Sequence, residues 1–278
     1  MTVTLDDVSC LLHIPIDGML LSHESISRDD AVEMMMRYLG SSLGDALDEV
    51  NKTRGAHARL SYLRKIFKVR LLLQLELDNE GGMEEVVQRL RDQTLRIYLM
   101  YLIGITLFTD KSATYVDVVH LRYFRDLEVV AGFSWGAARL YDFYMELNHA
   151  AHWSCSQLSG YFTLLQAWTY QHFRVIGSKD VWGGYQDDMH PRAMLFASQV
   201  GLFTPNSYRG HLDALDLVGV VMAPYAEHHQ TCPFERVGLY FGWLRYGNRM
   251  VRYLSKRLLR QFGYIQTVPR HPCESAPP

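Results

Sequence analysis

The stretch from Gly132 to Phe173 constrains the fold of this chain more than any other part of its sequence. Small, aromatic and leucine residues recur there every three or four positions, as they do on the buried faces of α-helices. This spacing predicts two helices, from Phe133 to Trp153 and from Leu158 to Phe173. The stretch contains none of the residue arrangements that catalysis usually needs, which favours a binding or scaffold domain over an enzyme.

Helical spacing also dominates the rest of the chain, and we predict a mainly α, single helical domain with a few short β-hairpins or strands. Thr4 and Asp7 form a capping-box pattern that opens one helix, and Ser27 opens another that Gly40 ends. The other predicted helices are His57–Leu77, Met83–Phe108, Val116–Val130 and Arg249–Phe262, and Tyr208–Val221 is predicted to begin as a helix and turn into a short strand before Pro224. Short strands are predicted around the Asp17-Gly18 turn and from Arg236 to Leu244, and 174–205 is predicted to be mostly loop.

Composition excludes several classes of protein. The 278 residues are 48% hydrophobic and 21% charged, and the net charge of −2 gives no global attraction to nucleic acid or anionic membrane. The most apolar window, Leu95 to Phe108, is shorter than the about 20 residues that cross a bilayer, and it contains Arg96. Four widely separated cysteines predict a reducing, intracellular compartment. The domain is expected to span residues 1–269, with a disordered tail at 270–278.

Two groups of histidine and cysteine have the ligand types that zinc prefers. They are His149, His152 and Cys155, and His228, His229 and Cys232. Neither group has a CxxC or HExxH spacing, so partly buried histidines and small hydrophobic cysteines are the better interpretation. No P-loop, nucleophile elbow or dinucleotide motif is present either. We therefore predict no catalytic residue, no metal and no cofactor, and no small-molecule substrate is evident.

The predicted C-terminal helix carries the most informative polar pattern. Its basic residues, together with one that precedes it, are Arg245, Arg249, Arg252, Lys256, Arg257 and Arg260. This basic stripe is a candidate docking surface for phosphate or for an acidic protein. The alternative is the solvated face of an amphipathic helix. A second basic group, which would extend the patch if the two helices are neighbours, is Arg59, Arg64, Lys65, Lys68 and Arg70.

The segments WGAARLYDFYMEL and LSGYFTLLQAWTYQHF resemble the central signature of the plant mobile domain family. Four other segments resemble the family in the same order along the chain. They are TVTLDDVSCLLHIPIDG, YLIGITLFTDKSATYVDVVHLRYFRDL, YRGHLDALDLVGVVMAPY and RLLRQFGYIQTVP. The resemblance implies a nuclear protein linked to meristem maintenance and transposon silencing. It also implies a phosphatase-type partner and no known catalytic residues.

The chain departs from the family pattern at three places. It begins directly before TVTLDD, where the family has a Leu-Pro-x-Gly-Glu stretch and earlier helices. Met222 and Ala223 replace the Trp before Pro-Tyr, and residues 254–256 replace a His-x-Pro-Asp pattern. These departures suggest a domain that lacks its N-terminal portion, in a degenerate transposon-derived copy.

Three hypotheses follow in order of preference. The first is a non-enzymatic interaction domain in a nuclear silencing complex, docking through the basic residues at 245–260. The second is direct nucleic-acid binding through the same residues. The third is a metal-dependent enzyme that uses the histidines. In all three the large residues of the central signature are expected to lie in the core: Trp135, Tyr141, Tyr161, Leu165 and Trp168.

Overall fold

The computed structural model describes residues 1–109, 114–155, 161–173, 175–176, 184–196, 205–216, 218–269 and 271. Within these ranges the fold is mainly α-helical, as the sequence predicts, with two small antiparallel sheets. The α-helices are α1 (Leu5–Leu12), α2 (Arg28–Leu39), α3 (Leu43–Thr53), α4 (Leu60–Asn79), α5 (Glu84–Ile105), α6 (Trp135–Ala150), α7 (Phe162–His172) and α8 (Pro205–Asp213). The strands are β1 (His57–Arg59), β2 (Tyr115–Asp117), β3 (Phe241–Tyr246) and β4 (Arg249–Leu254).

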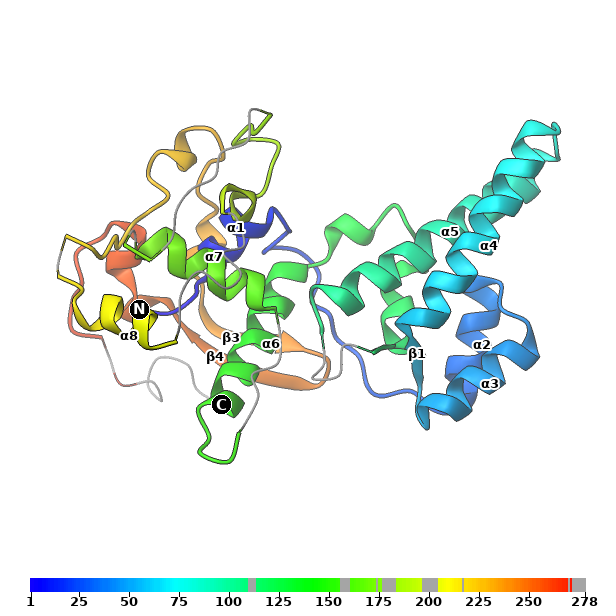
Figure 1. The fold of residues 1–278 in the computed structure, drawn as a ribbon, viewed down its shortest axis with the longest axis horizontal. Coiled ribbons are helices and arrows are strands. Elements are labelled where there is room, and N and C mark those ends of the chain that lie inside the picture. Colours follow the sequence, from blue (N-terminus) through cyan, green and yellow to red (C-terminus); the bar gives the residue numbers. More distant parts are fainter. Residues whose placement is uncertain are drawn as a thin grey trace.

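Two lobes follow one another along the longest axis of the molecule (Figure 1). The helical lobe comprises α2–α5, the β1–β2 pair and a 3₁₀ helix, η1, at Val118–Phe124. The mixed lobe comprises α1, α6–α8, the β3–β4 hairpin and five further 3₁₀ helices. These are η3 (Arg192–Leu195), η4 (His228–Gln230), η5 (Arg236–Leu239), η6 (Ser255–Arg257) and η7 (Leu259–Phe262). The chain starts in the mixed lobe, builds the helical lobe, and returns through the short η2 (Val130–Gly132) and α6.

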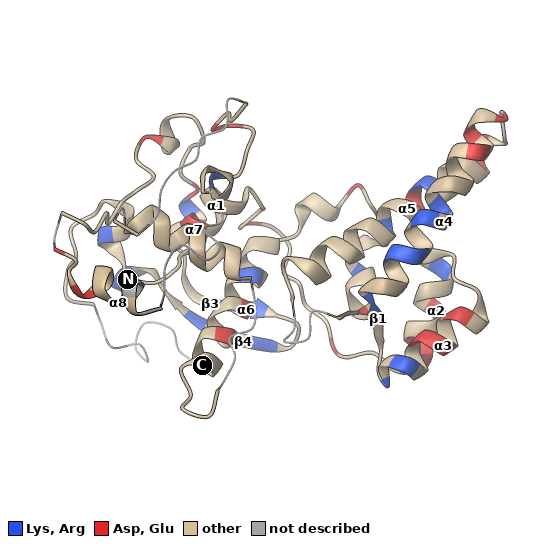
Figure 2. Ribbon diagram, in the orientation of Figure 1, with Lys and Arg blue, Asp and Glu red and all other residues tan. Residues whose placement is uncertain are grey.

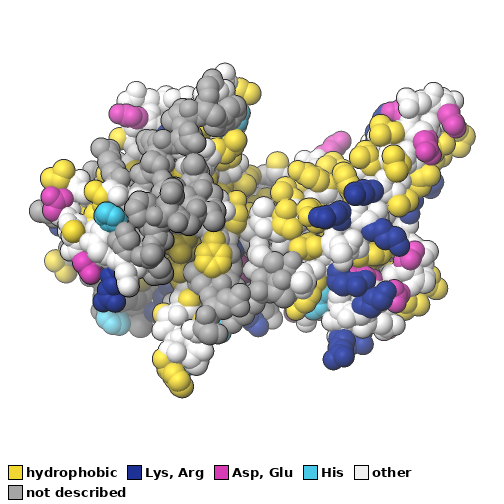
Figure 3. Space-filling view, in the orientation of Figure 1, with side chains coloured by type: hydrophobic (Ala, Val, Ile, Leu, Met, Phe, Trp, Pro, Cys, Tyr) yellow, Lys and Arg dark blue, Asp and Glu magenta, His cyan; other side chains and the backbone are white. Residues whose placement is uncertain are grey.

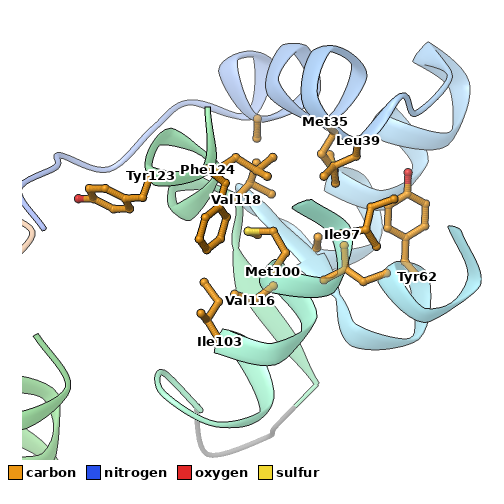
Figure 4. Packing of buried hydrophobic residues seen from close by; sticks show 14 of the residues in the cluster. Met35, Leu39, Tyr62, Ile97, Met100, Ile103, Val116, Val118, Tyr123 and Phe124 are labelled. Atoms are coloured by element: carbon orange, nitrogen blue, oxygen red, sulfur yellow. The ribbon is translucent and has the colours of Figure 1, made fainter. Parts of the chain in front are cut away.

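The core of the helical lobe is built where α2, α5 and η1 meet. Met35 from α2 and Met100 from α5 are fully buried, and Phe124 from η1 packs beside them (Figure 4). Capping boxes hold the first turns of α1 and α2, at Thr4 and Ser27, as the sequence predicts. Beyond this core α4 and α5 continue as an antiparallel helical hairpin that projects away from the rest of the molecule (Figure 1).

Trp135 and Gly136 place α6 between the two lobes. Trp135 is buried in the helical lobe, stacked on Phe124 with ring centroids 5.5 Å apart. Gly136 faces the other way, and its backbone N–H donates to the Pro15 carbonyl at 2.7 Å. A Cβ at position 136 would lie 2.7 Å from Ile16 Cγ2, so only glycine permits this approach.

A buried carboxylate anchors α1 in the mixed lobe. Asp7 Oδ1 lies 3.0 Å from His172 Nε2 in α7 and accepts a hydrogen bond from the Tyr225 hydroxyl at 2.8 Å. Its second oxygen accepts from the Thr4 hydroxyl and backbone N–H. Because every oxygen of this carboxylate has partners, its burial is compensated, and the α1 orientation is fixed from three directions.

An aromatic stack joins the lobes. Phe108, after α5, packs against both His120 of η1 and Tyr246 of β3, with ring centroids 5.1 and 4.5 Å away, and these two rings are 6.1 Å from each other. The Tyr246 hydroxyl lies 2.6 Å from His120 Nε2, and His120 Nδ1 lies 2.8 Å from the Asp117 carbonyl oxygen. A carbonyl can only accept, so Nδ1 carries the proton of the neutral ring and Nε2 accepts from Tyr246.

Most of the long predicted helices are present with small changes at their ends. The helix predicted at 57–77 begins later, because residues 57–59 pair with 115–117 as β1 and β2. Residues 116–130 are β2 and the 3₁₀ helices η1 and η2 rather than an α-helix, so that prediction was wrong. The hairpin around Asp17-Gly18 was also wrong, since Met19 makes only an isolated bridge to Phe133. The helix α3 was not anticipated, and the start of the predicted 158–173 helix lies outside the described residues.

The predicted helix at Arg249–Phe262 is the main error. Residues 249–254 form β4, which pairs with β3 in register Leu244↔Val251, and two 3₁₀ helices follow. A two-residue turn, Gly247-Asn248, closes this hairpin, and Gly247 has the positive φ of 59° that such turns use. Leu244 in β3 and Tyr253 in β4 are buried, whereas their neighbours along each strand are only partly buried. This alternation is that of a strand, so tertiary packing overrides the helical spacing of the basic residues. The predicted strand at 236–244 is correspondingly displaced to 241–246, after η5.

Large residues of the central signature are buried to different degrees. Trp135 and Tyr141 are in the core, as predicted. Tyr161, Leu165 and Trp168 are only partly buried and pack against the core of the mixed lobe. Among the described residues, no helix combines the length and the apolar character needed to cross a bilayer.

Candidate functional site

A cavity of about 320 Å³ opens where the end of α1 meets the segment from His228 to Glu235. Titratable and metal-binding side chains dominate its wall. They are Asp6, Cys10, His13, His228, His229, Cys232 and Glu235. Residues that are more than 200 positions apart in the sequence thus meet here, because α1 packs against the C-terminal third of the chain.

His13, His228 and Cys232 form the first group on this wall. One donor atom from each residue lies within 4.8 Å of the donor atoms of the other two. His228 is 1% exposed, whereas His13 and Cys232 are partly buried. The two imidazoles are nearly parallel, with ring centroids 5.8 Å apart. Their nitrogens and the sulfur are the donor types of zinc sites.

Two features single out His13. It ends α1 with a positive φ of 51°, a conformation that few non-glycine residues adopt. Its Nε2 is buried and has no hydrogen-bond partner. Burial and the nearby His228 lower the pKa of His13, so the ring stays neutral and keeps a lone pair for a ligand.

Asp187 orients the His228 ring through Nδ1. Its Oδ2 lies 2.7 Å from His228 Nδ1, and its Oδ1 accepts from Arg192 at 2.6 Å and from the Tyr185 hydroxyl at 2.7 Å. Burial alone would raise the pKa of Asp187, but the hydrogen bonds from Tyr185 and His228 and the charge of Arg192 lower it. An ionised Asp187 holds the proton of His228 on Nδ1, so Nε2 keeps its lone pair and can accept a hydrogen bond or bind a metal.

Asp6, Cys10 and His229 form the second group, and its members already bond to one another. Cys10 Sγ lies 3.7 Å from Asp6 Oδ1, and His229 Nε2 lies 3.2 Å from Asp6 Oδ2. His229 Nδ1 lies 3.1 Å from the Cys232 carbonyl oxygen. Burial alone would lower the pKa of His229, but the hydrogen bond to Asp6 raises it. This group is a closed hydrogen-bonded cluster.

The sequence analysis identified some of the residues that line this cavity and missed others. His228, His229 and Cys232 do lie together, but the residues of α1 and its C-terminal end that contact them were not expected there. His149 and Cys155 meet each other instead, with Nδ1 and Sγ 3.4 Å apart. His152 Nδ1 lies 2.8 Å from the Ser154 hydroxyl. Neither metal-capable group found among the described residues includes those three.

The basic residues predicted to form one helical stripe are distributed over β3, β4 and the 3₁₀ helices that follow. Arg252 lies over the Trp243 ring and Lys256 over the Phe241 ring, each 5.0 Å from the ring centroid. Arg245 Nε donates to the Gly247 carbonyl at 3.1 Å. The other three are exposed: Arg249, Arg257 and Arg260. A basic and aromatic outer face of the hairpin thus replaces the expected stripe.

The second basic group lies in the other lobe, on α4 except for Arg59, which ends β1 (Figure 2). Arg59 is paired with Glu49 at 2.7 Å, and Arg70 donates to the Gly40 carbonyl. The three remaining members, Arg64, Lys65 and Lys68, are exposed, and within the described ranges none of them has an ion-pair partner. The group therefore supplies three free cations on the helical hairpin.

Hydrophobic side chains lie beside these cations (Figure 3). Leu72 is 59% exposed and Val69 is 49% exposed, and both follow Lys65 and Lys68 at helical spacing. Tyr98 of α5 is 47% exposed and packs on Phe67 of α4, with ring centroids 6.2 Å apart. We call this surface, made of Arg64, Lys65, Lys68, Val69, Leu72, Leu75, Leu95 and Tyr98, the hairpin face.

Comparison with known proteins gives the relationships of the chain. It is 31% identical over 97% of its length to Protein MAIN-LIKE 2 of Arabidopsis thaliana, and 27% identical over 97% to Protein MAINTENANCE OF MERISTEMS. It is also 27% identical over 99% to the Serine/threonine-protein phosphatase 7 long form homolog of that plant. The aligned regions cover 39%, 53% and 20% of these relatives, so the chain spans about half or less of each.

No solved structure matches the chain. A family model does, and it covers nearly the whole sequence in one piece, which agrees with the order of the six segments that resemble the family. The matched residues are 1–276, and the chain belongs to the plant mobile domain family.

Proposed function

We propose that this chain is a non-enzymatic protein-interaction domain that acts in the nucleus with a phosphatase-type partner. The hairpin face carries the proposal. It exposes large apolar side chains on a projecting helical hairpin, and three cations beside them on α4 have no acidic partner among the described residues. Exposed apolar groups rimmed by charge are typical of protein-binding surfaces, whereas isolated exposed leucines are ordinary.

The relatives support the same proposal. Their similarity to this chain covers less than two thirds of each, and one of them is named a phosphatase homolog. A domain that recurs within longer proteins of different names acts as a module that brings other parts together. The name of another relative refers to the maintenance of meristems, and we propose a role in that process and in transposon silencing for this chain.

The test is recovery of a phosphatase-type protein with the tagged chain from nuclease-treated plant nuclei. The variant Leu72→Glu places a charge in the middle of the hairpin face and should reduce recovery at least about tenfold, since burying an unpaired charge is costly. Val268→Glu is the matched control, because Val268 is 96% exposed and lies outside this face. Equal recovery with both variants would remove the hairpin face as the docking surface, and no phosphatase with folded wild-type protein would overturn the proposal.

Direct nucleic-acid binding is the second candidate, and the outer face of the β3–β4 hairpin favours it. Arg252 on Trp243 and Lys256 on Phe241 combine cations with aromatic rings, as single-strand binding surfaces do. Binding of a single-stranded oligonucleotide should then weaken steeply with salt and be lost in Arg252→Glu. Leu72→Glu should leave it unchanged, which separates the two functions.

A further inference from the structure

We propose that His13, His228 and Cys232 bind a zinc ion that fastens the end of α1 to the segment after η4. The inference concerns a different part of the molecule from the hairpin face and does not depend on the proposed function. It starts from three donors of the types that zinc prefers, brought together from distant parts of the chain.

The spacing of the donors fits a zinc ion. Bonds of about 2.0–2.3 Å place tetrahedral ligand atoms about 3.3–3.8 Å apart. The three donor atoms lie within 4.8 Å of one another, so side-chain rotations that move each by about 1 Å complete the geometry. The adjacent cavity, which the same residues line, leaves the fourth position to water.

The surroundings also fit. Zinc-bound histidines usually donate their second ring N–H to a carboxylate, and Asp187 accepts from His228 in this way at 2.7 Å. His13 Nε2 is buried with no partner, a cost that a metal bond would offset. Binding requires Cys232 as thiolate, so the thiol proton is released to solvent when the Zn–S bond forms.

The second group in the same cavity is a poorer candidate. Asp6, Cys10 and His229 bond to one another, so a metal would have to break the contacts of all three, whereas at the proposed site only the long bond from the Cys232 thiol to the Asp187 carbonyl, at 3.6 Å, would be lost. His149 is exposed and Cys155 is partly buried, and this pair is in neither of the metal-capable groups among the described residues. These two groups therefore provide controls, because each contains a cysteine that the proposal leaves unliganded.

The expected effect of the metal on the fold is to hold two segments together. From Ala214 to Tyr240 the described chain contains only short 3₁₀ helices, turns and an isolated bridge at Val220. Such a segment has no long helix or strand to stabilise it. A zinc ion bound to His228 and Cys232, four residues apart, and to His13 would hold the segment on α1. Zinc binding should therefore raise the melting temperature of the protein.

The experiment measures zinc in the full chain, purified without a polyhistidine tag, and titrates the metal-stripped protein with Zn²⁺ against a chromophoric chelator. About one zinc ion per chain is expected, with affinity reduced at least about tenfold in Cys232→Ser. Cys10→Ser and Cys155→Ser should bind as the wild type does. With Co²⁺ as the probe, the thiolate-to-metal absorption band should be present in both controls and absent in Cys232→Ser.

A second variant keeps the test informative if Cys232→Ser is unstable. His13→Asn retains the left-handed backbone, which asparagine tolerates, and removes one ligand. It should also bind zinc at least about tenfold more weakly. Wild-type affinity in both variants, or loss of zinc only in Cys155→Ser, would overturn the proposal and assign the metal to surface binding.

Discussion

His120 makes the stability of this protein depend on pH in a predictable direction. It is 2% exposed at the junction of the lobes, with Asp117, Tyr246 and His23 around it. Burial lowers its pKa from 6.5 to about 4, while Asp117 opposes the shift and His23 adds to it. Between these two values the unfolded chain binds a proton that the folded protein does not, so stability is lost as the pH falls.

The magnitude follows from the two pKa values. With 6.5 for the unfolded and about 4 for the folded state, lowering the pH from 7.5 to 4.5 costs roughly 2–3 kcal/mol at this one site. The measurement is urea unfolding across this pH range for the wild type and for His120→Gln, which removes the titrating group but keeps a donor and an acceptor. The pH dependence of the variant should be weaker by roughly 2–3 kcal/mol over this range.

His152→Gln is the matched control, since His152 is exposed on the surface. Burial also lowers the pKa of the half-buried His13 and His23, which destabilises the fold in acid as well, so only the difference between wild type and variant isolates His120. The same pH dependence in His120→Gln and in wild type would refute the assignment of a neutral, buried His120 at this junction.

Two further substitutions test the packing of α6. Gly136→Ala places a methyl group 2.7 Å from Ile16 Cγ2 and should destabilise the protein by about 1–3 kcal/mol. Gly44→Ala is the control, because a Cβ there meets nothing within 4 Å. Equal urea unfolding midpoints for the two variants would contradict the close approach at Gly136. Trp135→Ala should lower the free energy of unfolding by about 3–5 kcal/mol, because it leaves a cavity in the core. Trp168→Ala should lower it less, because Trp168 is only partly buried. The reverse order in urea unfolding would show that the burial of these two residues is misassigned.

Local signals in the sequence were sufficient for several elements. The capping boxes at Thr4 and Ser27 involve residues three positions apart, and glycine at position 40 ends α2 through its own backbone preference. Such features are readable because they depend on neighbours along the chain. The periodicity of α5 and α6 is likewise long enough to exclude strands.

The error at the C-terminal hairpin has a specific cause. Basic residues at positions 249, 252, 256 and 260 match a helical repeat, but Gly247-Asn248 between two apolar runs is a hairpin signal that should have outweighed it. The cavity could not have been predicted in the same way. Asp7 in α1 is bonded to His172 and Tyr225, and Asp6 to His229, which holds the end of α1 near Cys232; such contacts have no signature in a single sequence.

The chain begins and ends in the mixed lobe, and this sets the order in which the two lobes can fold during synthesis. The core of the helical lobe uses residues between Leu21 and Ala138, all of which have left the ribosome while the C-terminal third is still being made. The first residues must wait: Leu5 N–H donates to Tyr253, and Thr2 bonds to Gln261 in both directions. Until then Leu5 lacks Tyr253 as a partner and the core of the mixed lobe is incomplete around α1, so the nascent chain should depend on chaperones over this interval.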